Sequence, residues 1–237
     1  MSAPRQLIFN FHGLGEPPAH VEAAERPYWI PVERFNEIAR LIRSQSTEGR
    51  VAITFDDGNA SDRDHALPIL KAYGLRATFF VLSEFVGRPG YLSADDIKAL
   101  SSAGMAIGSH GRRHQDWTTL RDELATEVRT SLASLSDIVG HGFTEVAVPF
   151  GRYDLRVLAV LRQCGVSRVY TSDNGLARAG AWLVPRNTVR VDTPLGAIEE
   201  MVDNGFPASR RMRMNIGWMV RQARQLPGAL FGRGASG

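Results

Sequence analysis

Short runs of apolar and β-branched residues alternate along the chain with longer stretches in which apolar residues recur at helical spacing. The short runs lack the strict alternation of a half-exposed strand, and such runs are typical of parallel strands buried on both faces. They predict strands at 7–11, 51–55, 77–81, 105–109, 145–149 and 168–172. The helical spacing predicts helices at 32–44, 62–74, 93–104, 119–140 and 154–165.

The ends of the predicted helices carry matching signals. Ser93 is a good N-cap residue, and Asp96 stands three residues after it. Glycines stand where four of the helices should end, at Gly74, Gly104, Gly140 and Gly165. Repeated strand-then-helix units predict either an α/β barrel or a doubly wound sheet.

Functional residue types stand at the carboxyl ends of three of the predicted strands. They are Asp56 and Asp57, Ser109 and His110, and Pro149 and Phe150. Convergence of such groups from several strand ends is the pattern of a barrel's catalytic face. The sequence also contains no GxGxxG or P-loop fingerprint and no internal repeat. We therefore expect an α/β fold, a TIM-like (β/α) barrel of about seven strands, over residues 1–206.

The composition fits one large domain, since 43% of the 237 residues are apolar. No apolar run approaches the roughly 18–20 residues that span a bilayer. The first residues lack the charged start, long apolar stretch and cleavage site of a signal peptide. Cys164 is the single cysteine, which excludes an internal disulfide and fits a reducing compartment. The expected location is the cytoplasm.

The net charge of +3 is distributed unevenly along the chain. Six arginines and no acidic residue follow Phe206, which leaves 22 basic against 25 acidic residues in 1–206. Residues 207–237 are therefore expected to form a basic amphipathic tail outside the barrel. The tail either lies on the anionic inner face of a membrane or packs on the barrel. Nucleic acid is not an expected partner, because no recognition motif accompanies the charge.

Two short strings, TFDDG at 54–58 and SHGRRH at 109–114, carry the candidate chemistry. Each is a weak signal alone, because Asp-Asp-Gly suits a turn and two histidines four residues apart are common. Four residues on a helical turn would place His110 and His114 on one face. Two imidazoles with one carboxylate form an open zinc site, and the second carboxylate is then available as a base. Together the strings predict metal-assisted hydrolysis.

These strings resemble the motifs of the polysaccharide deacetylase family, also called carbohydrate esterase family 4. TFDDG matches the first motif of the family, GSHGRRH the second, and VPFGRYD at 148–154 is similar to the third. The resemblance covers about residues 6–195. It implies a distorted (β/α) barrel and a divalent metal, usually Zn²⁺, with Co²⁺ or Ni²⁺ as alternatives. It also implies hydrolysis of an N-acyl or O-acyl group, most often N-acetyl on an amino sugar.

The family's functional residues are carried over position by position. Asp57, His110 and His114 would be the metal ligands, and Asp56 would be the general base. The backbone N–H of Phe150 would stabilise the oxyanion, and loss of one such donor typically costs about 100- to 1000-fold in rate.

The chain departs from the family pattern at three points. Gly111 stands where the second motif usually has Ser or Thr, and Ala147 stands where the third motif often has an arginine that braces the base. Arg186 could supply that guanidinium from another strand; otherwise it is a structural or surface residue. The last motif, Leu-x-x-His, is absent, because no histidine follows His141.

The reaction needs a general acid to protonate the leaving amine. His12, at the end of the first predicted strand, is the expected acid; the alternative is a hydrogen-bonded histidine at the barrel rim. His20 in a proline-rich loop, His65 in a helix and His141 near a helix end are weaker candidates.

Four further residues are candidate substrate contacts. Trp117, Trp182 and Tyr153 could contact sugar rings, although aromatic residues more often serve packing. Asp173 could bind sugar hydroxyls or tune the acid, although Asp-Asn-Gly is also turn chemistry.

The sequence thus predicts a metal-dependent deacetylase that acts on an amino sugar, oligosaccharide or glycan precursor. One alternative is a hydrolase of a non-sugar amide, a cyclic ureide or formamide, on the same barrel. Another is a catalytically silent glycan-binding domain. The sequence does not specify the oligomeric state.

Overall fold

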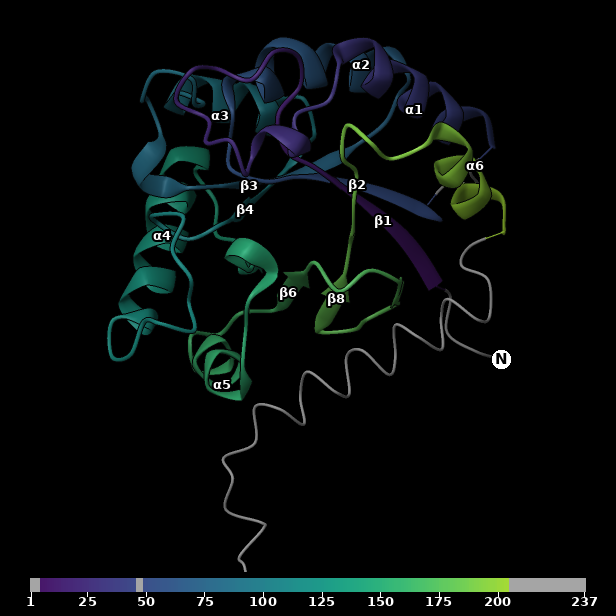
Figure 1. Cartoon of the computed structure of the whole chain (residues 1–237). Coiled ribbons are helices and arrows are strands. Elements are labelled where there is room, and N and C mark those ends of the chain that lie inside the picture. Colours follow the sequence, from purple (N-terminus) through teal and green to yellow (C-terminus); the bar gives the residue numbers. More distant parts are fainter. Residues whose placement is uncertain (1–4, 46–48, 205–237) are drawn as a thin grey trace, which may run out of the picture.

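The computed structural model describes residues 5–45 and 49–204, and these form a distorted, nearly closed α/β barrel (Figure 1). In this part of the chain one mostly parallel sheet has the strand order β7-β1-β2-β3-β4-β5-β6-β8, and β9 pairs with β1. The strands are β1 (Arg5–Phe11), β2 (Val51–Phe55), β3 (Ala77–Val81), β4 (Ala106–Ser109), β5 (Glu145–Ala147), β6 (Arg168–Thr171), β7 (Leu176–Arg178), β8 (Leu183–Pro185) and β9 (Asn187–Thr188). The predicted fold class is confirmed.

One short segment brings the two sides of the sheet together. β8 runs parallel to β6, and after the single residue Arg186 the chain continues as β9 along β1. β7 pairs antiparallel with the first half of β1, at Leu7 and Leu176, and β9 pairs with the second half, at Phe9 and Asn187. The segment from β8 to β9 therefore passes from one side of the barrel to the other and carries Arg186 between them.

The helices surround the sheet, as Figure 1 shows. They are α1 (Val32–Gln45), α2 (Leu67–Ala72), α3 (Ala94–Ser102), α4 (Leu124–Val139), α5 (Leu155–Gln163) and α6 (Leu195–Asn204). α3 begins with the expected cap, since Ser93 and Asp96 form a capping box. Two predictions need correction. The helix predicted at 62–74 opens as a π-helix (Asp62–Ala66), and the helix predicted at 119–140 begins only at Leu124.

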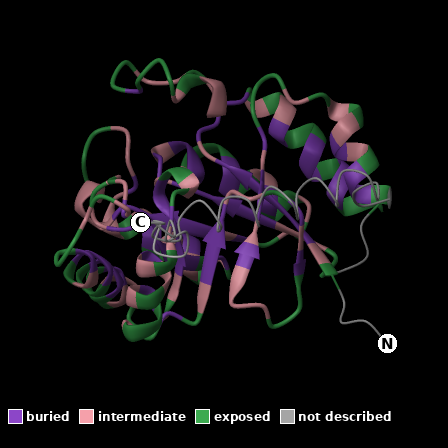
Figure 2. Cartoon of the chain, turned by 60° about the horizontal axis from the view of Figure 1, so that its bottom comes forward, coloured by how far each residue is buried: buried purple, intermediate pink, exposed green. Residues whose placement is uncertain are grey.

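Alternate strand residues face in opposite directions and build two apolar layers. One set packs against the helices, and Figure 2 shows the resulting contrast between buried strands and exposed outer helix faces. The other set fills the barrel and consists of Ile8, Phe80, Ala147, Tyr170, Ala177 and Val184. Gly108 is required beside it, because a side chain there would lie 2.4 Å from the Phe80 ring. The barrel interior is thus packed, and polar groups gather at its ends.

The predicted domain boundary at 206 and the basic tail at 207–237 lie outside the described residues. Among the described residues, no helix combines the length and apolar character needed to cross a membrane.

Candidate metal centre and active site

The turn after β2 sends two neighbouring carboxylates to different partners. Asp57 has φ +77°, a left-handed conformation that residues other than glycine rarely adopt, and Gly58 follows with φ +71°. The backbone of Asp56 stays alongside the end of β1, because its N–H donates to the carbonyl of Phe11 at 3.0 Å. Asp56 therefore contacts the barrel interior, while Asp57 faces the loop after β4.

His110 and His114 lie on that loop, which is irregular rather than helical, so the predicted helical turn is wrong. The physical reason is Gly111, whose φ of +89° breaks any helical path. The loop is held from α4 instead. Ser131 Oγ donates to the Gly111 carbonyl at 2.8 Å, and the buried Glu127 carboxylate accepts the N–H groups of residues 112 and 113 at 2.6 and 3.1 Å.

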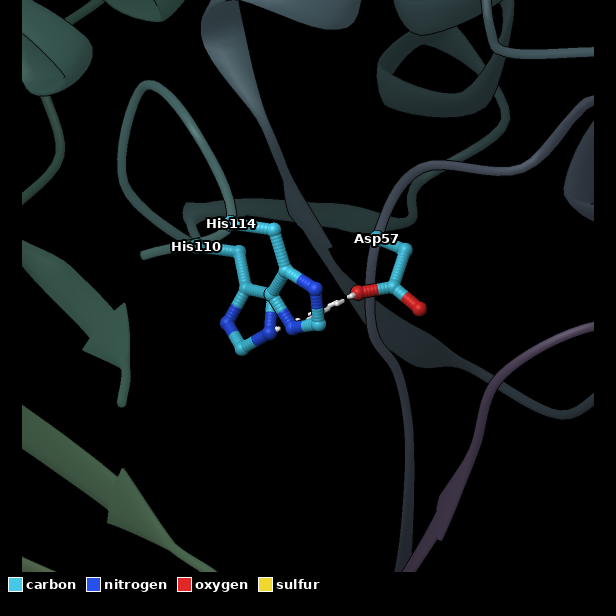
Figure 3. Close-up of side chains that lie close together, drawn as sticks. All are labelled: Asp57, His110 and His114. Atoms are coloured by element: carbon cyan, nitrogen blue, oxygen red, sulfur yellow. Dashed lines mark ion pairs between the residues drawn. The ribbon is translucent and has the colours of Figure 1, made fainter. Parts of the chain in front are cut away.

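The three predicted metal ligands meet in space (Figure 3). Asp57 Oδ1 lies 3.5 Å from His110 Nε2 and 3.7 Å from His114 Nε2. One ligand atom from each of the three residues lies within 4.8 Å of the others. Asp57 Oδ1 is buried and has no hydrogen-bond partner among the described residues. An orphaned carboxylate oxygen between two imidazoles fits a divalent metal site with an open coordination position.

The outer nitrogens of the two imidazoles have unlike partners. His110 Nδ1 lies 3.0 Å from the carbonyl oxygen of Ala147, and His114 Nδ1 lies 3.5 Å from Glu25 Oε1. Burial lowers the pKa of His110. Burial acts downward on His114 too, but Glu25 and Asp57 outweigh it and raise its pKa. Groups that fix the outer nitrogen leave Nε2 available to a metal.

Asp56 is clamped by Arg186, and both are fully buried. Arg186 donates from Nη1 to Oδ1 at 2.6 Å and from Nη2 to Oδ2 at 2.8 Å. Asn10 joins the pair, since its Nδ2 donates to Asp56 Oδ2 at 2.9 Å and its Oδ1 accepts from Arg186 at 2.8 Å. Burial alone would raise the pKa of Asp56, but the charges of Arg186 and His110 hold it well below its usual range.

Arg186 supplies the guanidinium that is missing at Ala147, where the third motif often has an arginine. Ala147 is fully buried in the apolar filling of the barrel. The Arg186 guanidinium lies above Phe80 of the same filling, with its carbon 5.3 Å from the ring centre. In this chain the guanidinium that contacts Asp56 comes from the junction of β8 and β9. In the usual third motif of the family, the arginine would come from β5. The catalytic role of Arg186 stays a prediction.

Phe150, Tyr153 and Asp173 lie at the carboxyl ends of the strands, near the same loop system. Phe150 has φ +56°, is 51% exposed and stacks on His114 with ring centres 4.1 Å apart. Tyr153 is buried and its hydroxyl donates to the Asp173 carboxylate. The predicted roles of the Phe150 amide and of the two other residues in substrate binding stay predictions.

The two tryptophans do not lie where a substrate could stack on them, and these predictions are wrong. Trp117 is fully buried beneath the histidine loop, 3.3 Å from the position of a Cβ at Gly111. Trp182 precedes β8 at the amino end of the strands, opposite the metal centre. Its Nε1 donates to the Val166 carbonyl at 2.7 Å, and Arg162 covers its ring at 3.7 Å.

His12 is half-buried directly after β1, against Tyr28 with ring centres 4.8 Å apart. Its Nδ1 is buried and has no hydrogen-bond partner among the described residues. Among the other candidates, His20 packs on Tyr91, while His65 and His141 are exposed. The role of His12 as the acid stays a prediction.

Three carboxylates near the metal centre were not predicted from the sequence. Glu25 and Glu127 contact the histidine loop from segments distant in sequence. Asp62, in the π-helix, is fully buried, and no side chain among the described residues donates a hydrogen bond to its carboxylate. Burial and the charges of Asp57 and Asp56 raise the pKa of Asp62 well above its ordinary value. Pairings at long sequence separation leave no local signal, and only the unusual burial marks Asp62.

Comparison with known proteins assigns the family. The sequence model of the polysaccharide deacetylase family matches residues 43–169, which is more than half of the chain. This protein therefore belongs to the polysaccharide deacetylase family, a family of hydrolases that act on carbon–nitrogen bonds other than peptide bonds. The predicted family and enzyme class are confirmed.

Two relatives and one solved structure are similar to this chain. YxkH of Bacillus subtilis is 29% identical over 146 residues, 61% of this chain and 52% of YxkH. The peptidoglycan-N-acetylglucosamine deacetylase PgdA of Listeria monocytogenes is 31% identical over 114 residues, 47% of this chain and 23% of PgdA. The chain thus spans about half or less of these relatives. The Streptococcus pyogenes deacetylase PplD, solved with acetate, has a TM-score of 0.77 at 20% identity and covers 87% of this chain and all of that chain (100%).

Proposed function

We propose that this protein is a metal-dependent deacetylase that hydrolyses an N-acyl group, N-acetyl first of all, on an amino sugar, oligosaccharide or glycan precursor. One observation carries the proposal: Asp57, His110 and His114 converge beside Asp56, and Arg186 holds Asp56 ionised. A binding domain has no use for a buried, charged base next to an open metal site.

Asp57, His110 and His114 would hold a divalent cation, and Zn²⁺ suits this donor set. When bound, the ion polarises an acyl oxygen and acidifies water. Asp56 is the proton acceptor in this scheme. Arg186 fixes its orientation and keeps it ionised, which also makes it a weak base. Asp56 therefore removes a proton only from a strongly acidified donor, and this explains why base and metal ligand occupy adjacent positions.

Phe150 and His12 complete the proposed mechanism, Phe150 at the acyl oxygen and His12 at the departing nitrogen. The backbone N–H of Phe150 stabilises the negative oxygen as the acyl carbon becomes tetrahedral. His12 gives a proton to the departing nitrogen, and such a general acid contributes about 10²- to 10⁴-fold. The unpartnered Nδ1 of His12 supports this assignment, because no hydrogen bond within the described residues occupies this nitrogen.

The substrate class rests on the family and on the activity of one relative. PgdA is a peptidoglycan-N-acetylglucosamine deacetylase. Its activity makes an N-acetylated amino sugar the first substrate to test here. The cytoplasmic location and the contact of residues 207–237 with an anionic membrane are proposals from the sequence, and flotation of the full chain with anionic vesicles tests the second.

The test is metal content by elemental analysis, together with acetate release from a panel of N-acetylated sugars and an acetyl-ester reporter. We expect about one bound metal per chain and turnover in the wild type. His110→Ala should lose both, Asp56→Asn should keep the metal and lose turnover, and the exposed control His141→Ala should change neither.

Stoichiometric metal with no acetate release would redirect the search to another acyl group or to a non-sugar amide. No metal after reconstitution with zinc, cobalt or nickel would refute the proposal and favour a silent glycan-binding domain. Loss of metal in Asp56→Asn would mean that the base and the ligand have been interchanged.

A further inference from the structure

The two histidine ligands differ in what holds them from behind. The outer nitrogen of His110 faces the Ala147 carbonyl at 3.0 Å, and the residue is 2% exposed. A carbonyl oxygen only accepts hydrogen bonds, so Nδ1 carries the hydrogen and Nε2 keeps its lone pair. The sheet itself, through β5, thereby fixes the tautomer and orientation of His110.

His114 has no such support from the sheet, because it lies on the loop beyond β4. Its ring lies between two carboxylates, with Nε2 3.7 Å from Asp57 Oδ1 and Nδ1 3.5 Å from Glu25 Oε1. An ionised carboxylate also only accepts hydrogen bonds. Glu25 can therefore hold the hydrogen of His114 on Nδ1, as the Ala147 carbonyl does for His110.

Glu25 is held in place although it lies on the long loop at 12–31. The ends of this loop are joined, since the Ile30 N–H donates to the Gly13 carbonyl at 3.1 Å. Trp29 packs directly on Gly13, where a Cβ would lie only 2.1 Å from its ring. Glu25 itself begins the 3₁₀ turn Arg26–Tyr28 and donates its N–H to the Glu22 carbonyl at 2.9 Å. The carboxylate is thus presented from a closed, packed loop.

We infer that Glu25 is a positioning residue of the metal centre, which orients His114 and directs its Nε2 lone pair toward the metal. The inference rests on the metal centre of the proposed function. A carboxylate behind a ligating histidine also raises the basicity of the ligand, and loss of such a partner typically weakens metal affinity about 10- to 100-fold. The loop at 12–31 then carries both the candidate acid, His12, and a support of the metal.

The test is Zn²⁺ affinity of the full chain, measured by competition with a chromophoric chelator. Glu25→Ala should raise the Zn²⁺ dissociation constant about 10- to 100-fold. Glu25→Gln should restore part of the affinity, because its amide oxygen can still accept from Nδ1. Glu22→Ala, which removes an exposed carboxylate from the same loop, should leave the affinity unchanged.

A spectroscopic measurement separates orientation from general stability. In Zn²⁺-loaded wild type, ¹⁵N-labelled His114 should show a single Nδ1–H tautomer, and in Glu25→Ala this signal should shift or broaden while that of His110 stays. If Glu25→Ala is poorly folded, Glu25→Gln supplies the comparison.

If Glu25→Ala bound Zn²⁺ as tightly as the wild type and its His114 signal were unchanged, the inference would be overturned. Hydrolysis by the wild type would still support the proposed function. Conversely, weaker Zn²⁺ binding in Glu25→Ala, in a chain that releases acetate from none of the substrates, would support the inference and redirect only the search for the substrate. A wild type that binds no Zn²⁺ would overturn the inference.

Discussion

Two arginine–carboxylate pairs lie at opposite ends of the barrel and differ in almost every respect. At the carboxyl end, Arg186 grips Asp56 with two hydrogen bonds of 2.6 and 2.8 Å, and their side chains are 0% and 4% exposed. At the amino end, Arg168 lies 3.7 Å from Glu145, and their side chains are 35% and 29% exposed. Water can solvate the second pair, whereas the first depends entirely on its protein partners.

The difference shows where this fold places unfavourable groups. A buried carboxylate is tolerated only when it is paired and hydrogen-bonded. The carboxyl end also holds the left-handed Asp57 and Phe150 and the orphaned oxygen of Asp57. Strain and unpaired polar atoms gather at functional sites, where a ligand completes them. The amino end carries an ion pair of the ordinary, partly solvated kind.

A hollow in the surface does not identify the site in this protein. A cavity of about 540 Å³ opens near the amino end, lined in part by Arg43, Arg76 and Thr78. None of the described residues that line it is an acid, a histidine or a cysteine. Its walls thus lack the side chains of the candidate metal centre, which all lie at the carboxyl end.

The largest expected effect on stability comes from removing the buried ion pair at the carboxyl end. Arg186→Met leaves the buried Asp56 carboxylate without its counter-charge, and we expect a loss of about 3–5 kcal/mol in the free energy of unfolding. The matched change Arg168→Met should cost only about 0–1 kcal/mol, because that pair is partly exposed. Urea unfolding of both variants at pH 7 measures the difference.

The pH dependence supplies the control for Arg186→Met. Arg186 lowers the folded-state pKa of Asp56, so the stabilisation is present above the unfolded pKa of about 3.9 and is lost as the pH falls below it. The gap between wild type and Arg186→Met should therefore narrow below about pH 4. Equal losses for the two arginine variants would contradict the contrast drawn between the two ends.

The sequence predicted the parts of the molecule that have a local pattern. Six strands and the main helices follow from apolar runs and helical spacing, and Asp57, His110 and His114 follow from motifs at strand ends. The strands β7, β8 and β9 were not predicted, because strands of two or three residues show no periodicity; β5 is as short, but it lies in the longer apolar run 145–149. They nearly close the barrel and place Arg186 beside Asp56.

The contacts that support the site could not be predicted for a different reason. Glu25 contacts His114 although the two residues lie 89 positions apart in the sequence, and Glu127 contacts the same loop from α4. The predictions for Trp117 and Trp182 as substrate contacts were wrong for two reasons. Trp117 is buried, and Trp182 lies at the amino end of the strands, away from the metal centre. Neither property can be read from an isolated aromatic residue.

The next effect concerns Asp62, a buried carboxylate at the carboxyl end with no cation to hold it. Its raised folded-state pKa means that its contribution to stability is lost as the pH rises from the unfolded pKa of about 3.9 toward the folded value. Asp62→Asn removes this cost and should stabilise the protein by about 1–3 kcal/mol at pH 7. Thermal unfolding between pH 4 and pH 8 should show a gain that grows with pH.

Asp64→Asn is the matched control, because Asp64 lies on the same π-helix and is exposed. It should change stability by less than about 0.5 kcal/mol. Destabilisation by Asp62→Asn would mean that the Asp62 carboxylate is ionised and has a cationic partner, so the contrast between Asp56 and Asp62 would disappear.

The smallest effect is expected at the amino end, for Tyr170→Phe. The Tyr170 hydroxyl donates to Glu145 at 3.2 Å, so its removal at pH 7 should cost about 0.5–1.5 kcal/mol, the usual net value of one hydrogen bond. Burial, with Glu145, raises the pKa of Tyr170 to about 12. Because the unfolded value is about 10, the wild type should lose stability through this group as the pH rises from 10 to 12, by up to about 1.4 kcal/mol per unit.

Tyr170→Phe cannot ionise, so its deficit at pH 7 should shrink or reverse at alkaline pH. Urea unfolding at pH 7 and at alkaline pH measures this change in the free energy of unfolding. In a pH titration of the folded proteins, the variant should lack the tyrosinate absorbance step near pH 12 that the wild type shows. If Tyr170→Phe instead cost as much as Arg186→Met, the polar groups of the amino end would be held as tightly as Asp56. Burial at the carboxyl end would then no longer distinguish the Arg186–Asp56 pair from an ordinary structural ion pair.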